Sequence, residues 1–132
     1  MSFRMIALVA ILALPTCSAR AADCQNKDYS PYSEDHACVN KYYEVMEIAH
    51  NLGRVLYYEE KCGLQYEPTA VARYIREHTP NDRFDFSGWV NTAASYERTM
   101  EKTFDKGSVS PNTLLAVCTS IQMAAKHYGF VK

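Results

Sequence analysis

The feature that most constrains this chain is a long segment of helical periodicity bracketed by two cysteines. It runs from Val39 to Cys62, and Cys38 stands directly before it. Its apolar side chains recur at the spacing of one helical face: Tyr42, Val45, Ile48, Ala49, Leu52, Val55, Leu56 and Cys62. We therefore predict a helix over 39–62 with Gly63 as its C-terminal cap. Gly53 inside this helix predicts a packing partner that comes close.

The amino-terminal residues predict export. Arg4 precedes an apolar run at 5–14, and small residues follow at 16–21. This is the order of regions in a secretory signal peptide, with cleavage expected after Ala21. The alternatives are cleavage after Ala19 or Ala22, and a lipoprotein acylated at Cys17.

The predicted signal peptide at 1–21 leaves one predicted helical domain at 22–132. Its 111 residues are enough for a single modest core. Loss of Arg4 and Arg20 lowers the formal net charge from −1 to −3. Such a weak acidic balance without a basic block argues against nucleic acid as a partner, and no later stretch is apolar enough to span a membrane. We expect the mature protein in a bacterial periplasm or outside the cell.

Four cysteines remain in the mature chain: Cys24, Cys38, Cys62 and Cys118. In an exported chain they predict two disulfides, for which three connectivities exist. Cys38 and Cys62 would lie about 36 Å apart at opposite ends of the first helix. If the last helix runs antiparallel to the first, Cys118 lies beside Cys62. We therefore predict the pairs Cys24–Cys38 and Cys62–Cys118.

The rest of the chain predicts an irregular arm and three further helices. The arm covers 23–37, where apolar periodicity is missing and a Ser-Pro turn signal occurs. Pro68 suits the first turn of a second helix, which ends before Pro80. Asp85 or Ser87 is the expected N-cap of the third helix.

Turn residues predict where the last two helices begin and end. Gly107 is expected to end the third helix, while Ser110 followed by Pro111 starts the fourth and Gly129 closes it. Short connections predict that successive helices pack as antiparallel neighbours. The expected fold is a compact all-α domain of four helices. The expected core stripe of its fourth helix is Leu114, Val117, Cys118, Ile121, Ala125 and Tyr128.

Motifs for catalysis and cofactor binding are missing from the sequence. No Gly-x-Ser-x-Gly or Cys-x-x-Cys occurs, and no two histidines have the spacing of a helical metal site. Met46 and His127 would approach each other in an up-down bundle, as haem ligands do, but both flank the core stripes. We therefore expect no cofactor or metal, assign no catalytic residue, and lean against an enzyme.

A second stripe on the first helix is the candidate interface. Tyr43, Met46, His50 and Tyr57 lie beside the core face, and tyrosine and methionine are enriched at protein interfaces. The alternative is that these tyrosines sit at the edge of the core, with one end of the ring in water.

Three functions are open at this point. The favoured one is a protein-binding module, such as an inhibitor, an immunity protein or a chaperone-like factor, whose partner is another periplasmic or extracellular protein. The alternative is a small-molecule carrier with a pocket between helices lined by Trp89, Tyr96 and Met100. A small secreted hydrolase has the least support.

Overall fold

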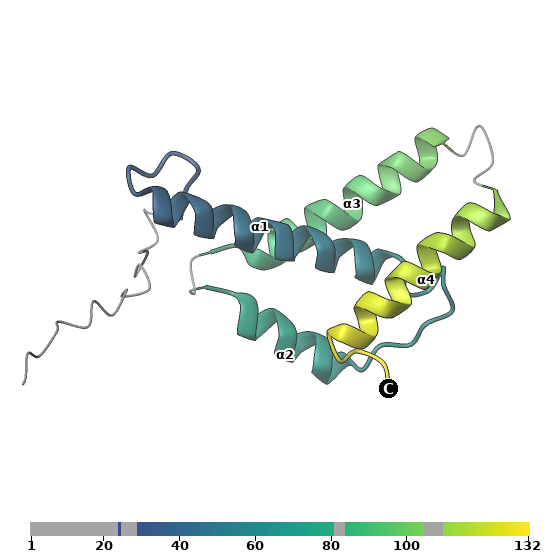
Figure 1. Cartoon of the computed structure of the whole chain (residues 1–132). Coiled ribbons are helices and arrows are strands. Elements are labelled where there is room, and N and C mark those ends of the chain that lie inside the picture. Colours follow the sequence, from purple (N-terminus) through teal and green to yellow (C-terminus); the bar gives the residue numbers. More distant parts are fainter. Residues whose placement is uncertain (1–23, 25–28, 81–83, 105–109) are drawn as a thin grey trace, which may run out of the picture.

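The computed structural model describes residues 24, 29–80, 84–104 and 110–132, and these form four helices without a strand. In chain order the helices are α1 (His36–Tyr57), α2 (Pro68–His78), α3 (Phe86–Phe104) and α4 (Pro111–His127) (Figure 1). The predicted all-helical class is confirmed. The predicted signal peptide at 1–21 and the predicted stop at Gly107 lie outside the described residues.

Short polar side chains and prolines start the helices. Asp35, Asp85 and Ser110 each accept a hydrogen bond from a first-turn backbone N–H, at 2.9, 2.9 and 3.2 Å. These bonds satisfy donors that have no partner inside the helix. Pro68 and Pro111 stand at the starts of α2 and α4, where a missing N–H costs nothing. The caps predicted for α3 and α4 are therefore confirmed.

The start of α1 differs from the prediction. Because Asp35 is the N-cap, the helix begins at His36, three residues before the predicted start at Val39. Cys38 consequently lies inside the first turn of α1. Its disulfide to Cys24, with the two Cα atoms 5.6 Å apart, attaches the arm to this turn.

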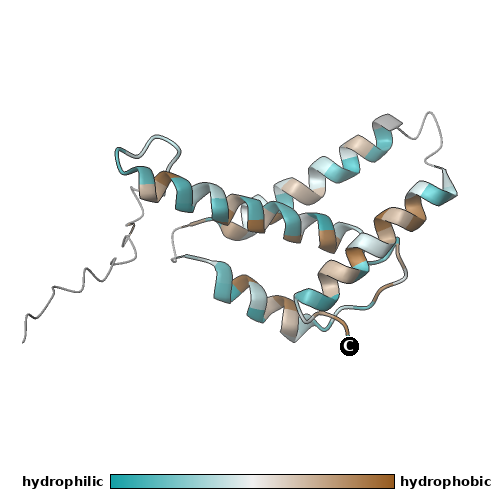
Figure 2. Ribbon diagram, in the orientation of Figure 1, coloured by the Kyte–Doolittle hydropathy of each residue, from teal (hydrophilic) through white to brown (hydrophobic). Residues whose placement is uncertain are grey.

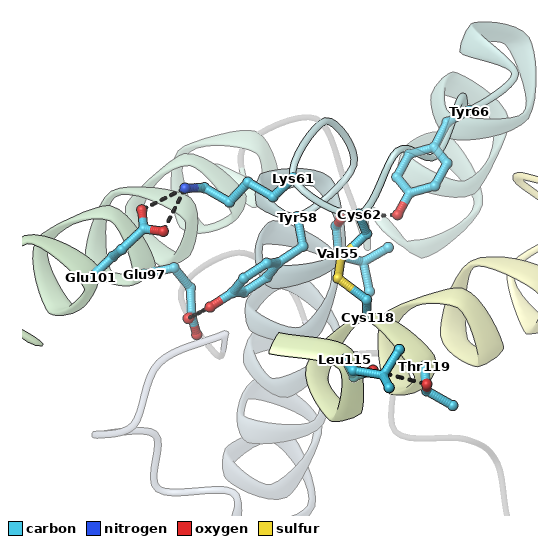
Figure 3. Close-up of a disulfide and its surroundings, with 10 residues drawn as sticks. All are labelled: Val55, Tyr58, Lys61, Cys62, Tyr66, Glu97, Glu101, Leu115, Cys118 and Thr119. Carbon is cyan, nitrogen blue, oxygen red and sulfur yellow. Dashed lines mark hydrogen bonds and ion pairs between the residues drawn. A yellow bond between two sulfur atoms is a disulfide. The ribbon is translucent and has the colours of Figure 1, made fainter. Parts of the chain in front are cut away.

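The end of α1 also differs from the prediction, which placed it at Cys62. The Val55 carbonyl accepts a hydrogen bond of 3.1 Å from the Tyr66 hydroxyl (Figure 3). In a continued helix the Glu59 N–H would donate to the Val55 carbonyl. It donates to the Leu56 carbonyl instead. After this break the chain turns as far as Gly63, whose φ of 64° suits a residue without a Cβ. Gly63 thus closes the turn, and Cys62 lies beyond the helix.

The Tyr66 hydroxyl remains a donor across the physiological pH range. Burial, with a smaller contribution from the Glu59 carboxylate, raises the pKa of Tyr66 to about 12. The same segment is held by a second bond, in which the Tyr66 N–H donates to the Glu59 carboxylate at 2.6 Å.

A second disulfide joins the turn after α1 to α4. The Cα atoms of Cys62 and Cys118 lie 5.3 Å apart (Figure 3). Together with the Cys24–Cys38 bond, this disulfide confirms both predicted pairings. Along its length α4 runs back past the end of α1 toward α2 (Figure 1). Two disulfides are consistent with a compartment that oxidises thiols. No described helix is long and apolar enough to cross a membrane.

The helices do not pack in the predicted order. α1 makes its most extensive backbone approach with α3, and no consecutive pair of described helices comes as close. Their contacts advance in the same direction along the two chain segments, which shows that α1 and α3 run parallel. The pairs in contact are Tyr42 with Phe84, which lies two residues before α3, His50 with Tyr96, Arg54 with Glu97, and Tyr57 with Glu101.

Gly53 explains why α1 and α3 are neighbours. A Cβ at this position would lie 2.7 Å from the Ala93 Cβ and would also collide with the Val90 carbonyl. The missing side chain lets the two backbones approach, as the sequence predicted without identifying the partner helix. Replacement of Gly53 by any larger residue would push the helices apart.

The core lies between α1 and the other elements, and Figure 2 shows apolar residues along the side of α1 that faces α2. After Gly129 the chain turns back, and Phe130 inserts its ring into this core with no exposed area. The Phe130 carbonyl also accepts a hydrogen bond of 3.0 Å from the Glu67 N–H. The buried cluster consists of Val45, Ala49, Leu52, Val55, Tyr66, Ala70, Phe86, Val90, Ile121, Ala125 and Phe130.

The first half of α4 is less buried than the sequence predicted. Of the predicted stripe, only Ile121 and Ala125 are fully buried, while Leu114 is 41% exposed. The carboxyl-terminal end of α3 and the amino-terminal end of α4 extend beyond the end of α1, so α1 does not cover the first turns of α4 (Figure 1). The disulfide at Cys118 marks where the buried half of α4 begins.

Candidate binding groove between α1 and α3

Side chains of α1 and α3 line an open groove of about 210 Å³. We call it the α1–α3 groove, and its lining residues are Met46, His50, Trp89, Thr92, Ala93 and Tyr96. Three of the six carry rings, and none carries a permanent charge. The groove therefore combines an apolar lining with aromatic edges.

The helical repeat places these residues in two facing rows. On α1, Met46 and His50 are one turn apart. On α3, Trp89 and Tyr96 are two turns apart, with Thr92 and Ala93 between them. Ala93 is buried and forms part of the base. The Thr92 hydroxyl donates a hydrogen bond of 2.9 Å to the Gly88 carbonyl, one turn earlier on α3.

The aromatic residues of the groove are accessible from outside. Trp89 is 37% exposed and Tyr96 is 54% exposed, although both have large apolar rings. The rings of His50 and Tyr96 approach across the two helices, with centroids 6.4 Å apart. Tyr43, one turn before Met46 on α1, is also 54% exposed.

The structure separates the four residues of the predicted interface. Met46 and His50 line the groove, and Tyr43 lies one turn away on the same side of α1. Tyr57 is instead half-buried, and its hydroxyl donates a hydrogen bond to the Glu101 carboxylate of α3. The interface itself stays a prediction, with Tyr57 engaged inside the domain.

The predicted small-molecule pocket is likewise divided. Trp89 and Tyr96 line the groove as that hypothesis required, but Met100 is not among the lining residues. Residues from two separate hypotheses, the α1 stripe and the α3 pocket, thus form one groove. Sequence reasoning missed Thr92 and Ala93, although they lie on the same helical row as Trp89 and Tyr96.

The haem arrangement that the sequence allowed is not formed. Met46 faces α3 in the groove, whereas His127 is exposed at the end of α4, with its ring beside Tyr128. Among the described residues, no group of three His, Cys, Asp or Glu side chains is arranged to hold a metal ion.

A larger hollow of about 730 Å³ opens on the other flank of the α1–α3 pair. The α3 side chains that line this hollow form a different row, which includes Asn91 and Arg98. Its lining is more polar than that of the groove. Its wall contains Tyr57, Lys61 and Glu101, which form a hydrogen-bonded cluster.

Glu101 is the centre of that cluster. Lys61 Nζ lies 2.6 Å from both carboxylate oxygens, and the Tyr57 hydroxyl donates to the same group (Figure 3 shows the Lys61 contact). The bond from Lys61, then that from Tyr57, holds the pKa of Glu101 below its usual value. Next to it, Tyr58 donates 3.5 Å to Glu97, which also pairs with Arg54. These contacts tie the end of α1 to α3.

We expect Glu101→Gln to destabilise the fold in a pH-dependent way. A carboxyl whose pKa is lowered on folding stabilises the folded state above its unfolded pKa of about 4.3, and this contribution is lost as pH falls through the folded pKa. Because the Glu101 side chain is 36% exposed, solvent screening limits the loss at pH 7 to about 1 kcal/mol. Urea unfolding of the native chain and of the variant at pH 7 and at pH 3 measures this loss of stability.

The control for this prediction is Glu60→Gln, which removes a neighbouring exposed carboxylate that has no ion pair among the described residues. It should leave the urea midpoint nearly unchanged at both pH values. A Glu101→Gln effect of equal size at pH 3 would contradict the assigned role of the carboxylate.

Comparison of the chain with models of protein families, with curated proteins and with solved structures found no match.

Proposed function

We propose that this chain is an exported protein-binding module of the bacterial periplasm, acting as an inhibitor, an immunity protein or a chaperone-like factor. The observation that carries the proposal is the α1–α3 groove, where Trp89 and Tyr96 are exposed around an apolar base. Aromatic residues that a partner can bury in a pocket are typical of the residues that dominate binding energy at protein interfaces.

The surface around the groove also supports a protein partner. The adjoining outer side of α3 carries no charged side chain along residues 88–96, where Thr92 and Ser95 alternate with the aromatic rings. Depletion of charge is the compositional mark of an interface centre. The hydroxyl-bearing and aromatic residues together resemble the composition of binding surfaces that use tyrosine, serine and tryptophan.

A small-molecule carrier is less well supported by the same groove. Pockets for small organic ligands usually measure about 300–1,000 Å³ and enclose most of the ligand surface. The groove measures about 210 Å³ and is open along one side. Its size fits one large side chain of a partner better than a whole ligand.

The proposal is tested by capturing partners from a periplasmic extract. The bait is the mature disulfide-bonded chain, compared with the double variant Trp89→Ala/Tyr96→Ala. Neither side chain belongs to the buried cluster, so the variant should fold and show a native helical circular dichroism spectrum. Loss of two hot-spot residues should lower the affinity for the partner by more than tenfold, because each such side chain contributes about 1–2 kcal/mol or more to the binding free energy.

The matched control is Leu115→Ala/Met123→Ala on α4, which removes two large side chains that are each 68% exposed. It should capture the same partner as the native chain. The proposal fails if the folded groove variant captures that partner as well as the native chain does.

A further inference from the structure

We infer that the α1–α3 groove receives a basic side chain of the partner protein, above all an arginine. The inference rests on the proposed function, because it names the chemistry that the groove would recognise. Three features carry it: the size of the groove, its exposed π faces and the balance of charge around it.

The size limits the occupant to one side chain. A cavity of about 150 Å³ holds a benzene molecule, so the volume of about 210 Å³ admits one aromatic ring or one long side chain. The apolar base at Met46 and Ala93 suits a stem of methylene groups. An arginine or lysine can lay such a stem on apolar atoms while its charged head stays near water.

The exposed rings suit a cation at the head of that stem. The faces of tryptophan and tyrosine attract a cation within about 6 Å of the ring centroid, with tryptophan the strongest. Trp89 and Tyr96 stand on the same side of α3, two turns apart, and Tyr43 is exposed on α1 nearby. A planar guanidinium can also stack on a ring, which an ammonium group cannot do.

The charges around the groove leave an excess of negative charge. Lys41 is paired with Glu44 at 3.1 Å, and Arg54 is paired with Glu97 at 3.7 Å. Glu47, next to Met46 and one turn before His50, is exposed and forms no ion pair with any described residue. A basic partner would complement Glu47, whereas an acidic partner would be repelled.

The test selects ligands without assuming a sequence. A phage library of random peptides is panned on the immobilised mature chain, and the affinity of enriched peptides is measured from Trp89 fluorescence. Trp89 is the only tryptophan in the sequence, so the signal reports on the groove. We expect the enriched peptides to share an arginine, and its replacement by norleucine to weaken binding about tenfold.

Two variants of the protein make the test specific. Glu47→Gln should lower the affinity for the arginine peptide about threefold and leave the affinity for its norleucine analogue unchanged. Only the charged guanidinium would interact with the carboxylate. Glu60→Gln, which changes the net charge equally but lies at the hollow on the other flank, should change neither affinity.

Each other outcome overturns the inference. If the norleucine and arginine peptides bind equally and Tyr96→Ala weakens both, the groove binds apolar side chains, so the basic specificity is wrong but the proposed function stands. If Trp89 emission depends on protein concentration and Tyr96→Ala removes this dependence, the occupant is a second copy of the chain. If no selected peptide is weakened by Tyr96→Ala, both the inference and the proposed function fail.

Discussion

Replacement of Cys62 and Cys118 by serine is expected to lower the free energy of unfolding by about 4 kcal/mol. The disulfide closes a loop with a sequence separation of 56, and the chain-entropy relation gives about this value for such a loop. Folded domains of this size are stable by only about 5–15 kcal/mol. The loss should therefore remove a large share of the stability, and urea unfolding at neutral pH would measure it.

The structure gives this disulfide a second role beyond loop closure. The first half of α4 has exposed apolar residues, and α4 approaches the backbone of α1 at few positions. Cys118 therefore holds α4 where packing alone is thin. Hydrogen exchange should show faster opening of α4 in the serine variant than of α1.

The control is the double serine variant of Cys24 and Cys38. This disulfide has a sequence separation of 14, for which the same relation gives about 3 kcal/mol, and it anchors only the arm. We expect the smaller loss here. A larger loss than for the Cys62–Cys118 pair would contradict the assigned role of α4.

Replacement of Phe130 by alanine is expected to cost about 3–5 kcal/mol, although this residue is third from the end of the chain. Its ring is fully buried and lies 5.5 Å, centroid to centroid, from the rings of Tyr66, Tyr74 and Tyr128. Alanine would leave a cavity among these rings that the rigid helices could fill only in part. Thermal and urea unfolding would measure the loss.

Val131→Ala is the matched control, because it truncates the neighbouring side chain, which is only partly buried. It should cost clearly less than Phe130→Ala. If Phe130→Ala lowered stability by less than about 1 kcal/mol, the carboxyl-terminal segment would not belong to the core, since core truncations of this kind cost several times more.

The parts of the fold that depend on local chemistry were predictable from the sequence. The starts of α3 at Asp85 and of α4 at Ser110 and Pro111 are examples. A side-chain oxygen accepts a hydrogen bond from a free first-turn N–H whatever the tertiary contacts of the helix are. These caps needed no knowledge of which helices touch. The pairing of Cys62 with Cys118 also required the assumption that the last helix runs antiparallel beside the first.

The parts that depend on distant contacts were not predictable. α1 ends where the hydroxyl of Tyr66, from a later segment, donates a hydrogen bond to the Val55 carbonyl. The sequence pattern within α1 does not predict that bond. Gly53 predicted a close neighbour but could not identify α3. The burial of Phe130 was missed because a single aromatic residue after Gly129 has no periodicity to reveal its direction.

The candidate site was predictable in pieces. Met46 and His50 were assigned to an interface, and Trp89 and Tyr96 to a pocket, but only the parallel pairing of α1 with α3 joins them. Its position on the stripe gives Tyr57 the same helical face as Tyr43, Met46 and His50, so the sequence pattern does not separate it from them. Its bond to Glu101 distinguishes it, and a long-range bond of this kind leaves no local signal.

The most direct test of the groove is a map of the contact surface by two-dimensional NMR. A partner or selected peptide would be added to an isotopically labelled chain of residues 22–132. We predict the largest shift changes at the indole N–H of Trp89 and at the amides of residues 43–50 and 88–96. Changes centred on residues 114–123 of α4, with Trp89 unaffected, would contradict the assignment of the groove as the binding surface.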